Sequence, residues 1–148
     1  MKLYKLITLS FLLTTAFDLL AAPKLFDFKD PKGVNHVMFM LDAPLEFISG
    51  NGNDIYGMVS FDKEHPEKTN GEIRLAVSSL SVSSQKMTDV MKGKKWLNLA
   101  KNKEIYFKFD SIKVNKEEDA LIHADATGVL TLMGISKEVT APVRIALA

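Results

Sequence analysis

The segment Ile105-Tyr106-Phe107-Lys108-Phe109-Asp110 decides the fold, because apolar and polar side chains alternate along it. Successive side chains of a β-strand point to opposite faces, so a period of two gives a strand one apolar and one polar face. The same alternation is present in Glu72–Ser78 and, over the longest stretch, in Leu121–Leu132. These segments predict a mainly β protein.

Further segments share this pattern less regularly, and turn-forming residues separate them from one another. The additional predicted strands are Val37–Leu41, Ile55–Phe61 and Val143–Leu147. The predicted turns are Asp30–Gly33, a hairpin-like loop at Ser49–Asp54, Glu64–Gly71 and Lys116–Asp119. Many short strands at close spacing are typical of an antiparallel barrel or sandwich.

One segment between the strands favours a short helix. Ser83-Ser84 can cap its start, and Gly93 can end it. Met87 and Met91 lie four residues apart, on one face of that helix. A second short turn containing Trp96 is expected after it. One or two short helical segments in a β protein predict a barrel mouth that is partly covered.

The first residues have the order of a secretory signal. Lys2 and Lys5 precede the apolar run Leu6–Phe17, and Ala21-Ala22 offers small residues at a cleavage point. That run is shorter than the roughly 20 residues of an ordinary membrane span. Residues 1–22 are therefore predicted to be a signal peptide, and residues 23–148 one periplasmic or secreted domain. The alternative is an uncleaved N-terminal anchor.

The charge and the residue types exclude several classes of function. The chain has 19 basic and 18 acidic residues, and loss of Lys2, Lys5 and Asp18 with the signal would leave seventeen of each. This balance argues against a nucleic-acid partner, which requires a basic patch. The sequence has no cysteine, so disulfides, Cys-ligated metal sites and a cysteine nucleophile are excluded.

No arrangement in the sequence indicates catalysis or metal binding. His36, His65 and His123 are far apart and lack the spacing of metal ligands. The serine-rich stretch between residues 78 and 84 has no nucleophile-elbow motif around it. Glu117–Asp119 fits a solvated loop. We therefore expect no bound metal, no cofactor and no enzymatic activity.

Two segments, Gln85–Ile112 and Gly128–Val143, resemble the YceI-like family of secreted bacterial proteins. The similarity covers roughly Val34–Val143, and Thr88 stands where the family usually has an arginine before Asp89. The residues that carry the resemblance are Asp89, Trp96, Leu97, Ile105, Phe107, Ser111, Gly128, Leu130, Thr131, Gly134, Ser136, Lys137 and Val139.

The resemblance implies a lipocalin-like antiparallel β-barrel that holds an apolar isoprenoid-type lipid, such as a quinone tail or a polyprenyl chain. A small barrel with an apolar interior can enclose one such ligand without any polar catalytic group. The expected contact with a membrane is limited to lipid exchange. The candidate ligand-binding residues are Val37, Phe39, Val59, Phe61, Ile73, Leu75, Val77, Met87, Met91, Trp96, Ile105, Phe107, Phe109, Leu130 and Leu132.

Other interpretations of these residues stay open. The inward side chains could simply pack together as a core, and the residues around Met87 and Met91 could plug the barrel. A stress-response or interaction module could use the same barrel without a tightly held ligand. An enzyme is the third alternative.

Family members generally continue for some tens of residues beyond the strand that corresponds to Glu138–Leu147. The resemblance therefore implies a barrel that is incomplete at the C-terminus. We expect Val143, Ile145 and Leu147 on an edge strand with a partly exposed apolar face, and a homodimer is one way to cover it. The alternative is a smaller barrel in which the last strand pairs with Leu25–Phe28 or Val37–Leu41.

Overall fold

The computed structural model describes residues 22–44 and 46–147. The predicted signal peptide therefore lies, apart from Ala22, outside the described residues. The described part consists of antiparallel strands, one α-helix and two short 3-10 helices. This confirms the prediction of a mainly β, antiparallel fold with a short helical insertion.

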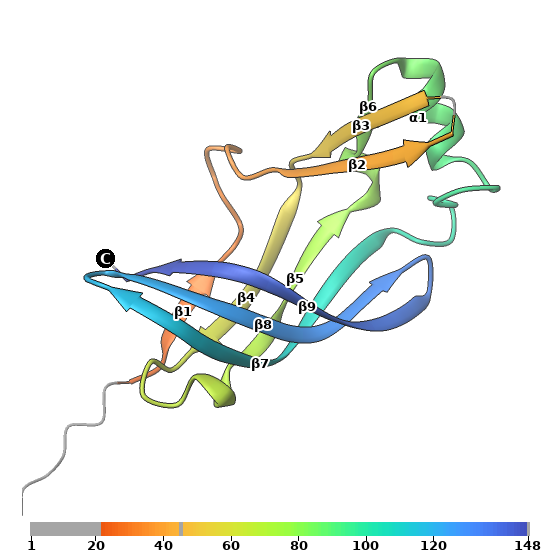
Figure 1. Ribbon diagram of the computed structural model, residues 1–148. Coiled ribbons are helices and arrows are strands. Elements are labelled where there is room, and N and C mark those ends of the chain that lie inside the picture. The colour runs from red at the N-terminus through yellow and green to blue at the C-terminus, as the bar shows by residue number, and fades with distance from the viewer. Residues whose placement is uncertain (1–21, 45, 148) are drawn as a thin grey trace, which may run out of the picture.

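The larger sheet has six strands in the order β1-β4-β5-β7-β8-β9 (Figure 1). Every neighbouring pair is antiparallel. The strands are β1 (Lys24–Asp27), β4 (Ile55–Phe61), β5 (Asn70–Ala76), β7 (Glu104–Glu118), β8 (Leu121–Leu132) and β9 (Ile135–Ala146). The 3-10 helices η1 (Pro66–Lys68) and η2 (Val77–Ser79) flank β5.

The smaller sheet contains β2 (Val37–Ala43), β3 (Glu46–Gly52) and the two-residue strand β6 (Ser81–Val82). The helix α1 (Gln85–Lys92) follows β6 directly. Figure 1 shows the β2–β3 hairpin standing apart from the larger sheet: β3 continues into β4 at one end of the hairpin, and α1 lies toward the other end, at the right. The two sheets thus enclose space at the α1 end.

The structure corrects the prediction of a hairpin-like loop at Ser49–Asp54. Residues 46–52 form β3, which pairs with β2 along its whole length and with β6 at Gly50 and Asn51. A Cβ atom on Gly50 would lie 2.2 Å from Cζ of Phe39. The glycine therefore serves close packing rather than a turn, because it lets the Phe39 ring lie across β3.

Two glycines in the middle of the larger sheet have backbone conformations that L side chains rarely adopt. The φ angle is 126° at Gly57 and 130° at Gly71. A Cβ atom at either position would lie 2.2 Å from a carbonyl oxygen of the neighbouring strand. Glycines of this kind mark bends and close backbone approaches in a sheet. They allow β4 and β5 to coil tightly around the interior.

The larger of two core clusters comes from the inner faces of β4, β7 and β8. Its buried members are Val59, Phe61, Phe109, Ile112, Ile122, Ala124 and Ala126. Half-buried residues of β1 and β9, among them Phe26 and Val143, pack against the same cluster. The sheet therefore curls far enough for its first and last strands to share one core.

The edge-strand prediction for the last segment agrees with the strand order. β9 pairs with β8 along its whole length, and among residues 22–44 and 46–147 the hydrogen-bonded order ends at β9. Within these residues no ladder joins β9 to Leu25–Phe28 or to Val37–Leu41. Val143, Ile145 and Leu147 are half-buried against the larger core cluster.

Candidate functional site

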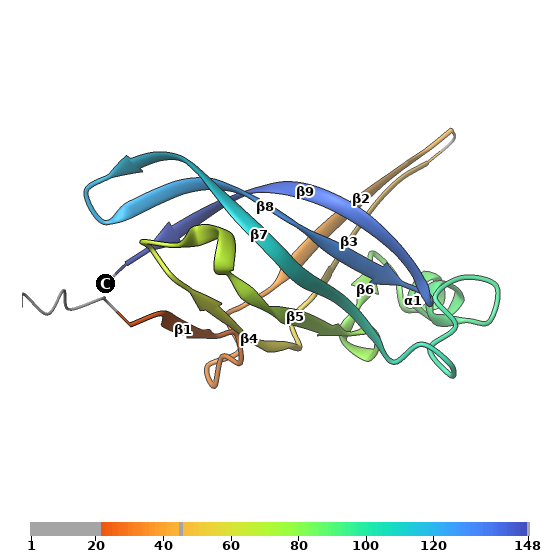
Figure 2. The ribbon, with the colours of Figure 1, turned by 90° about the horizontal axis from the view of Figure 1, so that it is seen from below.

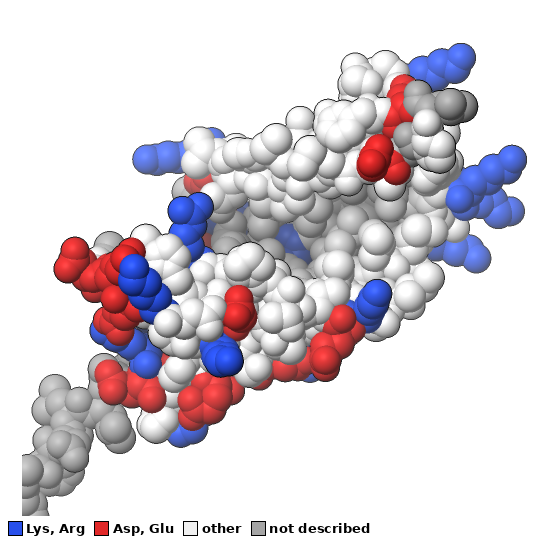
Figure 3. Space-filling model, in the orientation of Figure 1, with Lys and Arg blue, Asp and Glu red and all other residues white. Residues whose placement is uncertain are grey.

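An apolar cavity of about 660 Å³ lies between the two sheets at the α1 end. Its walls come from β2, β3 and β6, from the ends of β5, β7 and β8, and from α1 with the turn that follows it. Figure 3 shows the surface hollowed between the small sheet and the front strands of the larger one. Among the described residues, every side chain that lines the cavity is apolar except that of Lys86.

The structure brings together nine of the fifteen candidate ligand-binding residues around this cavity. They come from both sheets and from the helical insertion. These residues are Val37, Phe39, Leu75, Met87, Met91, Trp96, Ile105, Leu130 and Leu132.

The other six candidates lie in the core instead of the cavity wall. Val59, Phe61 and Phe109 are buried members of the larger cluster, against which Ile73 and Phe107 pack. The rings of Phe107 and Phe109 meet edge to face, with centroids 4.8 Å apart. Val77, predicted on a strand, begins η2 and is buried with Leu75 and Leu80 in the smaller cluster. Within the described ranges, side chains thus fill the interior between β4, β7 and β8, and the cavity lies nearer to α1.

Sequence reasoning missed eight lining residues. Two signals could have found some of them: the apolar character of both faces of the strand at Val37–Leu41, and the apolar residues adjoining Met87 and Met91 on the predicted helix. The remainder lie on strands that the sequence reasoning did not predict, directly after η2, or in the turn after α1. The missed residues are Met40, Leu41, Ile48, Leu80, Val82, Lys86, Val90 and Leu97.

Local hydrogen bonds hold α1 over the cavity. The Ser84 side chain caps the helix by accepting a hydrogen bond from the backbone N–H of Met87 at 3.2 Å. The buried Thr88 hydroxyl accepts from the N–H of Val82 at 3.1 Å, which ties the helix to β6. Lys92 donates to the carbonyl of Ser78 at 2.6 Å. The predicted cap and the predicted end at Gly93 are both confirmed.

The mouth of the cavity leaves large apolar side chains in contact with water. The exposed fraction is 56% for Val90, 52% for Trp96 and 45% for Leu41. Burial of apolar surface is favourable by about 25 cal/mol per Å², so an apolar ligand that covers these groups gains free energy. The cavity is therefore suited to an apolar ligand.

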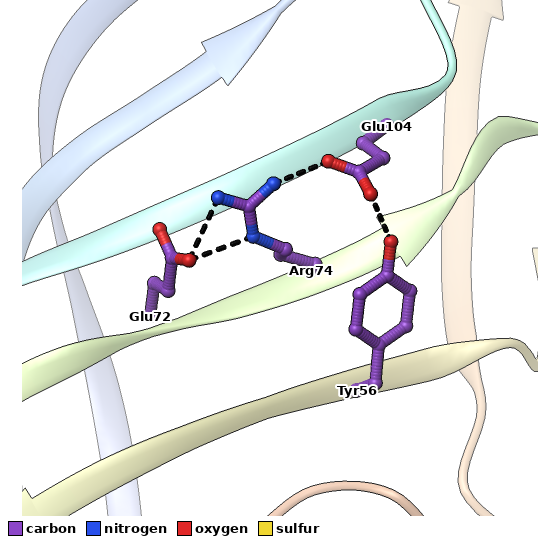
Figure 4. A network of polar contacts seen from close by, with 4 residues as sticks. All are labelled: Tyr56, Glu72, Arg74 and Glu104. Atoms are coloured by element: carbon purple, nitrogen blue, oxygen red, sulfur yellow. Dashed lines mark hydrogen bonds and ion pairs between the residues drawn. The ribbon is translucent and has the colours of Figure 1, made fainter.

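A polar network lies on the outer face of the larger sheet (Figure 4). The Tyr56 hydroxyl donates to Glu104, and the Arg74 guanidinium donates both to Glu104 and, at 2.7 Å from Nε, to Glu72. Arg74 also lies over the ring of Tyr106, 5.2 Å from its centroid. These residues join β4, β5 and β7 side by side, so the network stabilises the pairing of β5 and β7, which contribute Leu75 and Ile105 to the cavity wall.

The network shifts the pKa values of its members. The hydrogen bond from Tyr56, followed by the one from Arg74, lowers the pKa of Glu104 from 4.5. The same hydrogen bond to Glu104 raises the pKa of Tyr56 from 10.0 to about 12. The hydrogen bonds to Glu72 and Glu104 raise the pKa of Arg74. Each group is thereby held in the charge state that the network requires at neutral pH.

Glu104→Gln is expected to lower the free energy of unfolding at neutral pH by about 1 kcal/mol, because these side chains are partly exposed and water screens them. The lowered pKa of Glu104 means that its contribution is complete above pH 4.5 and is lost as the pH falls through the folded-state value. The raised pKa of Tyr56 means that its contribution is complete below pH 10.0 and is lost as the pH rises through about 12. The difference in the free energy of unfolding between the variant and the unaltered protein should therefore shrink in acid and in strong base. Urea unfolding at a series of pH values measures this difference.

The matched control is Glu138→Gln, which removes a carboxylate exposed on β9. This control should leave the midpoint of urea unfolding almost unchanged at neutral pH. An equal loss in both variants would show that net charge, and not the network, sets the effect.

Within residues 22–44 and 46–147, no helix has the length and apolar character needed to cross a membrane. The described part of the chain also brings together no group of three His, Asp or Glu side chains that could hold a metal ion.

Comparison with known proteins shows similarity over most of the chain. The YceI-like domain matches residues 30–148. A UPF0312 protein of Pseudomonas aeruginosa is 28% identical over 94 residues, which cover 64% of this chain and 47% of the relative. A UPF0312 protein of Pseudomonas syringae pv. syringae is 32% identical over 93 residues, covering 63% and 46% respectively. The chain thus spans about half the length of these curated relatives.

Solved structures share the fold. The chain resembles BcnA of Burkholderia cenocepacia with a TM-score of 0.61 at 20% identity, covering 76% of this chain and 68% of that one. It resembles the YCEI protein of Campylobacter jejuni with a TM-score of 0.52 at 16% identity, covering 70% and 57%. Together with the match over residues 30–148, these likenesses establish that the chain belongs to the YceI-like domain family.

Proposed function

We propose that this protein binds an apolar isoprenoid-type lipid, such as a quinone tail or a polyprenyl chain, in the cavity between its two sheets. The observation that carries the proposal is the lining: about 660 Å³ of space bounded by apolar side chains from both sheets and from α1. Pockets for small molecules commonly have volumes of roughly 300–1,000 Å³. The cavity is therefore large enough for a substantial part of a lipid chain.

The methionines favour a long, irregular ligand. Met40, Met87 and Met91 line the cavity, and methionine side chains adapt their shape to apolar partners. The open mouth allows the rest of a lipid chain or its headgroup to extend into the solvent. Both features fit an unbranched or isoprenoid chain better than a compact, rigid molecule.

The proposed activity is binding without catalysis. Lys86 is the one ionisable side chain among the described lining residues, and it is exposed at the helix. Acid–base and nucleophilic catalysis need positioned groups of complementary function within hydrogen-bond reach of one another. An apolar lining instead stabilises a bound chain through burial alone.

The proposed place of action is the periplasm or the exterior of the cell. This part of the proposal is supported by Lys2 and Lys5, by the apolar run at 6–17 and by the small residues Ala21-Ala22. Loss of the signal would leave a chain whose contact with membranes serves lipid exchange.

Native mass spectrometry tests both parts of the proposal on protein expressed with its own N-terminal segment and recovered from the periplasmic fraction. We expect a complex of the protein with an apolar compound of several hundred daltons. The mass of the polypeptide should be that of a chain whose first residue is at or near Ala22 or Pro23. Protein stripped of ligand in urea and refolded should recover a quinone with an isoprenoid tail from detergent. Repeated isolation without bound lipid, and failure to take up the quinone, would favour the interaction module.

A further inference from the structure

We infer that the rim of the cavity is a docking surface for an anionic lipid bilayer. The rim is defined by exposed apolar residues at the end of α1 and at the β8–β9 turn, together with the lysines beside them. The reason for docking rests on the proposed lipid-binding function, but the surface itself can be recognised and tested independently.

Exposed apolar side chains gather on this rim. The exposed fraction is 52% for Trp96, 56% for Val90 and 72% for Ile135, while Met133 is 40% exposed. Trp96 and Leu132 both line the cavity, which places the turn after α1 and the β8–β9 turn at the same opening. Figures 1 and 2 show α1 and the β8–β9 turn at the same end of the molecule, and in Figure 1 the segment that follows α1 lies between them.

The β8–β9 turn presents its apolar side chain at a conformational cost. Met133 and Gly134 both have positive φ angles, 54° and 74°, between the paired residues Leu132 and Ile135. Turns that need two positive φ angles favour Asn-Gly or Asp-Gly. A methionine in this conformation is strained and, being exposed, gains little burial in compensation. Insertion of its side chain into a lipid surface would supply that burial.

The segment that contains α1 and the turn after it is rich in lysine. Between residues 85 and 103 the basic side chains are Lys86, Lys92, Lys94, Lys95, Lys101 and Lys103, and the one acidic side chain is Asp89. Figure 3 shows Lys and Arg side chains projecting at the α1 end. Basic residues near an anionic membrane strengthen binding by about fivefold each at low ionic strength.

The distribution of charge orients the molecule. Glu117 and Glu118 are the last residues of β7, and Asp119 begins the turn to β8, at the end of these strands far from α1. The turn is thus shorter than the predicted Lys116–Asp119, because residues 116–118 pair with β8. Near the mouth, the acidic Asp42 and Glu46 lie on the small sheet, beside the β2–β3 turn. An anionic surface would therefore attract the molecule by α1 and the β8–β9 turn. This orientation opens the cavity toward the bilayer.

The combination of tryptophan and lysine favours a bilayer over an acidic protein as the partner. Interfacial membrane segments typically place Trp and other apolar groups at the headgroup level with basic residues beside them. A bilayer also contains the class of ligand that the cavity would accept. A surface that touches the membrane by the mouth lets the lipid pass without crossing water.

Flotation with lipid vesicles tests the inference, and the single tryptophan of the chain, Trp96, gives a second readout. Purified protein should float with vesicles of phosphatidylcholine and phosphatidylglycerol, but not with phosphatidylcholine alone, and molar salt should release it. Trp96 emission should shift to shorter wavelength on binding. Lys94→Glu combined with Lys95→Glu should weaken flotation at least tenfold.

The matched control is Lys108→Glu combined with Lys113→Glu, the same charge change on β7, where both side chains are exposed. This control should float like the unaltered protein. Equal losses in the two double variants, or no flotation with anionic vesicles at low salt, would overturn the inference. Binding to an acidic polypeptide without binding to vesicles would overturn it in favour of a protein partner.

Native mass spectrometry of the same samples separates this inference from the proposed function. Bound lipid in a protein that does not float would leave the lipid-binding function standing and refute the docking surface. Flotation of a protein that never carries lipid would leave the docking surface standing and refute the lipid-binding function.

Discussion

Gly71→Ala is expected to lower the free energy of unfolding by about 4 kcal/mol, which is a large part of the 5–15 kcal/mol typical of a domain. The φ angle of 130° at Gly71 is one that L residues rarely adopt, and this strain costs about 1–3 kcal/mol. The added Cβ would also lie 2.2 Å from the carbonyl oxygen of Met58 and 2.7 Å from Cα of Val59. Because these are backbone atoms, β4 would have to move away from β5.

Gly33→Ala is the matched control for the glycine prediction. Its φ angle is 66°, yet nothing lies within 4 Å of a Cβ built there. This control should lose only about 1 kcal/mol, the cost of the left-handed conformation. Urea unfolding of both variants measures the difference. Equal losses would mean that conformational strain alone, and not the close approach of β4 to β5, is responsible.

The central strands of the larger sheet could be predicted from the sequence because one face of the sheet is buried and the other is solvated. Apolar and polar side chains alternate at Ile105–Asp110 and Leu121–Leu132 because of this difference between the faces. Both segments lie in strands. The helix could be predicted because its signals are local: Ser84 caps it and Gly93 ends it. These features depend on neighbours in the sequence, not on distant contacts.

The smaller sheet could not be predicted in full because its strands carry little of that asymmetry. The more exposed face of β2 carries Met38, which is 73% exposed, so apolar character does not separate the two faces in the sequence. In β3 the glycines and asparagine at 50–52 have the composition of a turn. Their role depends on Phe39, which lies across Gly50 from another strand. A contact between strands of this kind leaves no local signal.

The sequence predicted which side chains of the candidate site point into the interior, but not where along each strand the cavity lies. A period of two tells which side chains point inward, and both Phe109 and Ile105 do so. It does not tell where along the strand the interior is filled. Phe109 is buried in the larger core cluster, whereas Ile105 on the same strand lines the cavity. The difference arises because the small sheet stands away from the larger one at the α1 end.

Ile48→Asp is expected to weaken binding of an apolar lipid at least a hundredfold while changing the stability of the empty protein much less. Ile48 is half-buried on β3 and lines the cavity. Water reaches the open cavity when it is empty, so a carboxylate there stays solvated. A bound lipid would remove that water and leave a charge in apolar surroundings, which costs several kcal/mol. The substitution therefore destabilises the complex with lipid much more than it destabilises the empty protein.

The same reasoning gives the pH dependence and the control for this variant. Because a bound lipid would raise the pKa of the introduced carboxyl group, the variant should bind lipid more tightly as the pH falls and the group is protonated. Phe47→Asp is the matched control: Phe47 is the neighbouring residue on β3, it is 66% exposed, and it does not line the cavity. Quinone uptake followed by native mass spectrometry should show a loss in Ile48→Asp alone. Equal uptake by both variants would place the lipid somewhere other than between the two sheets.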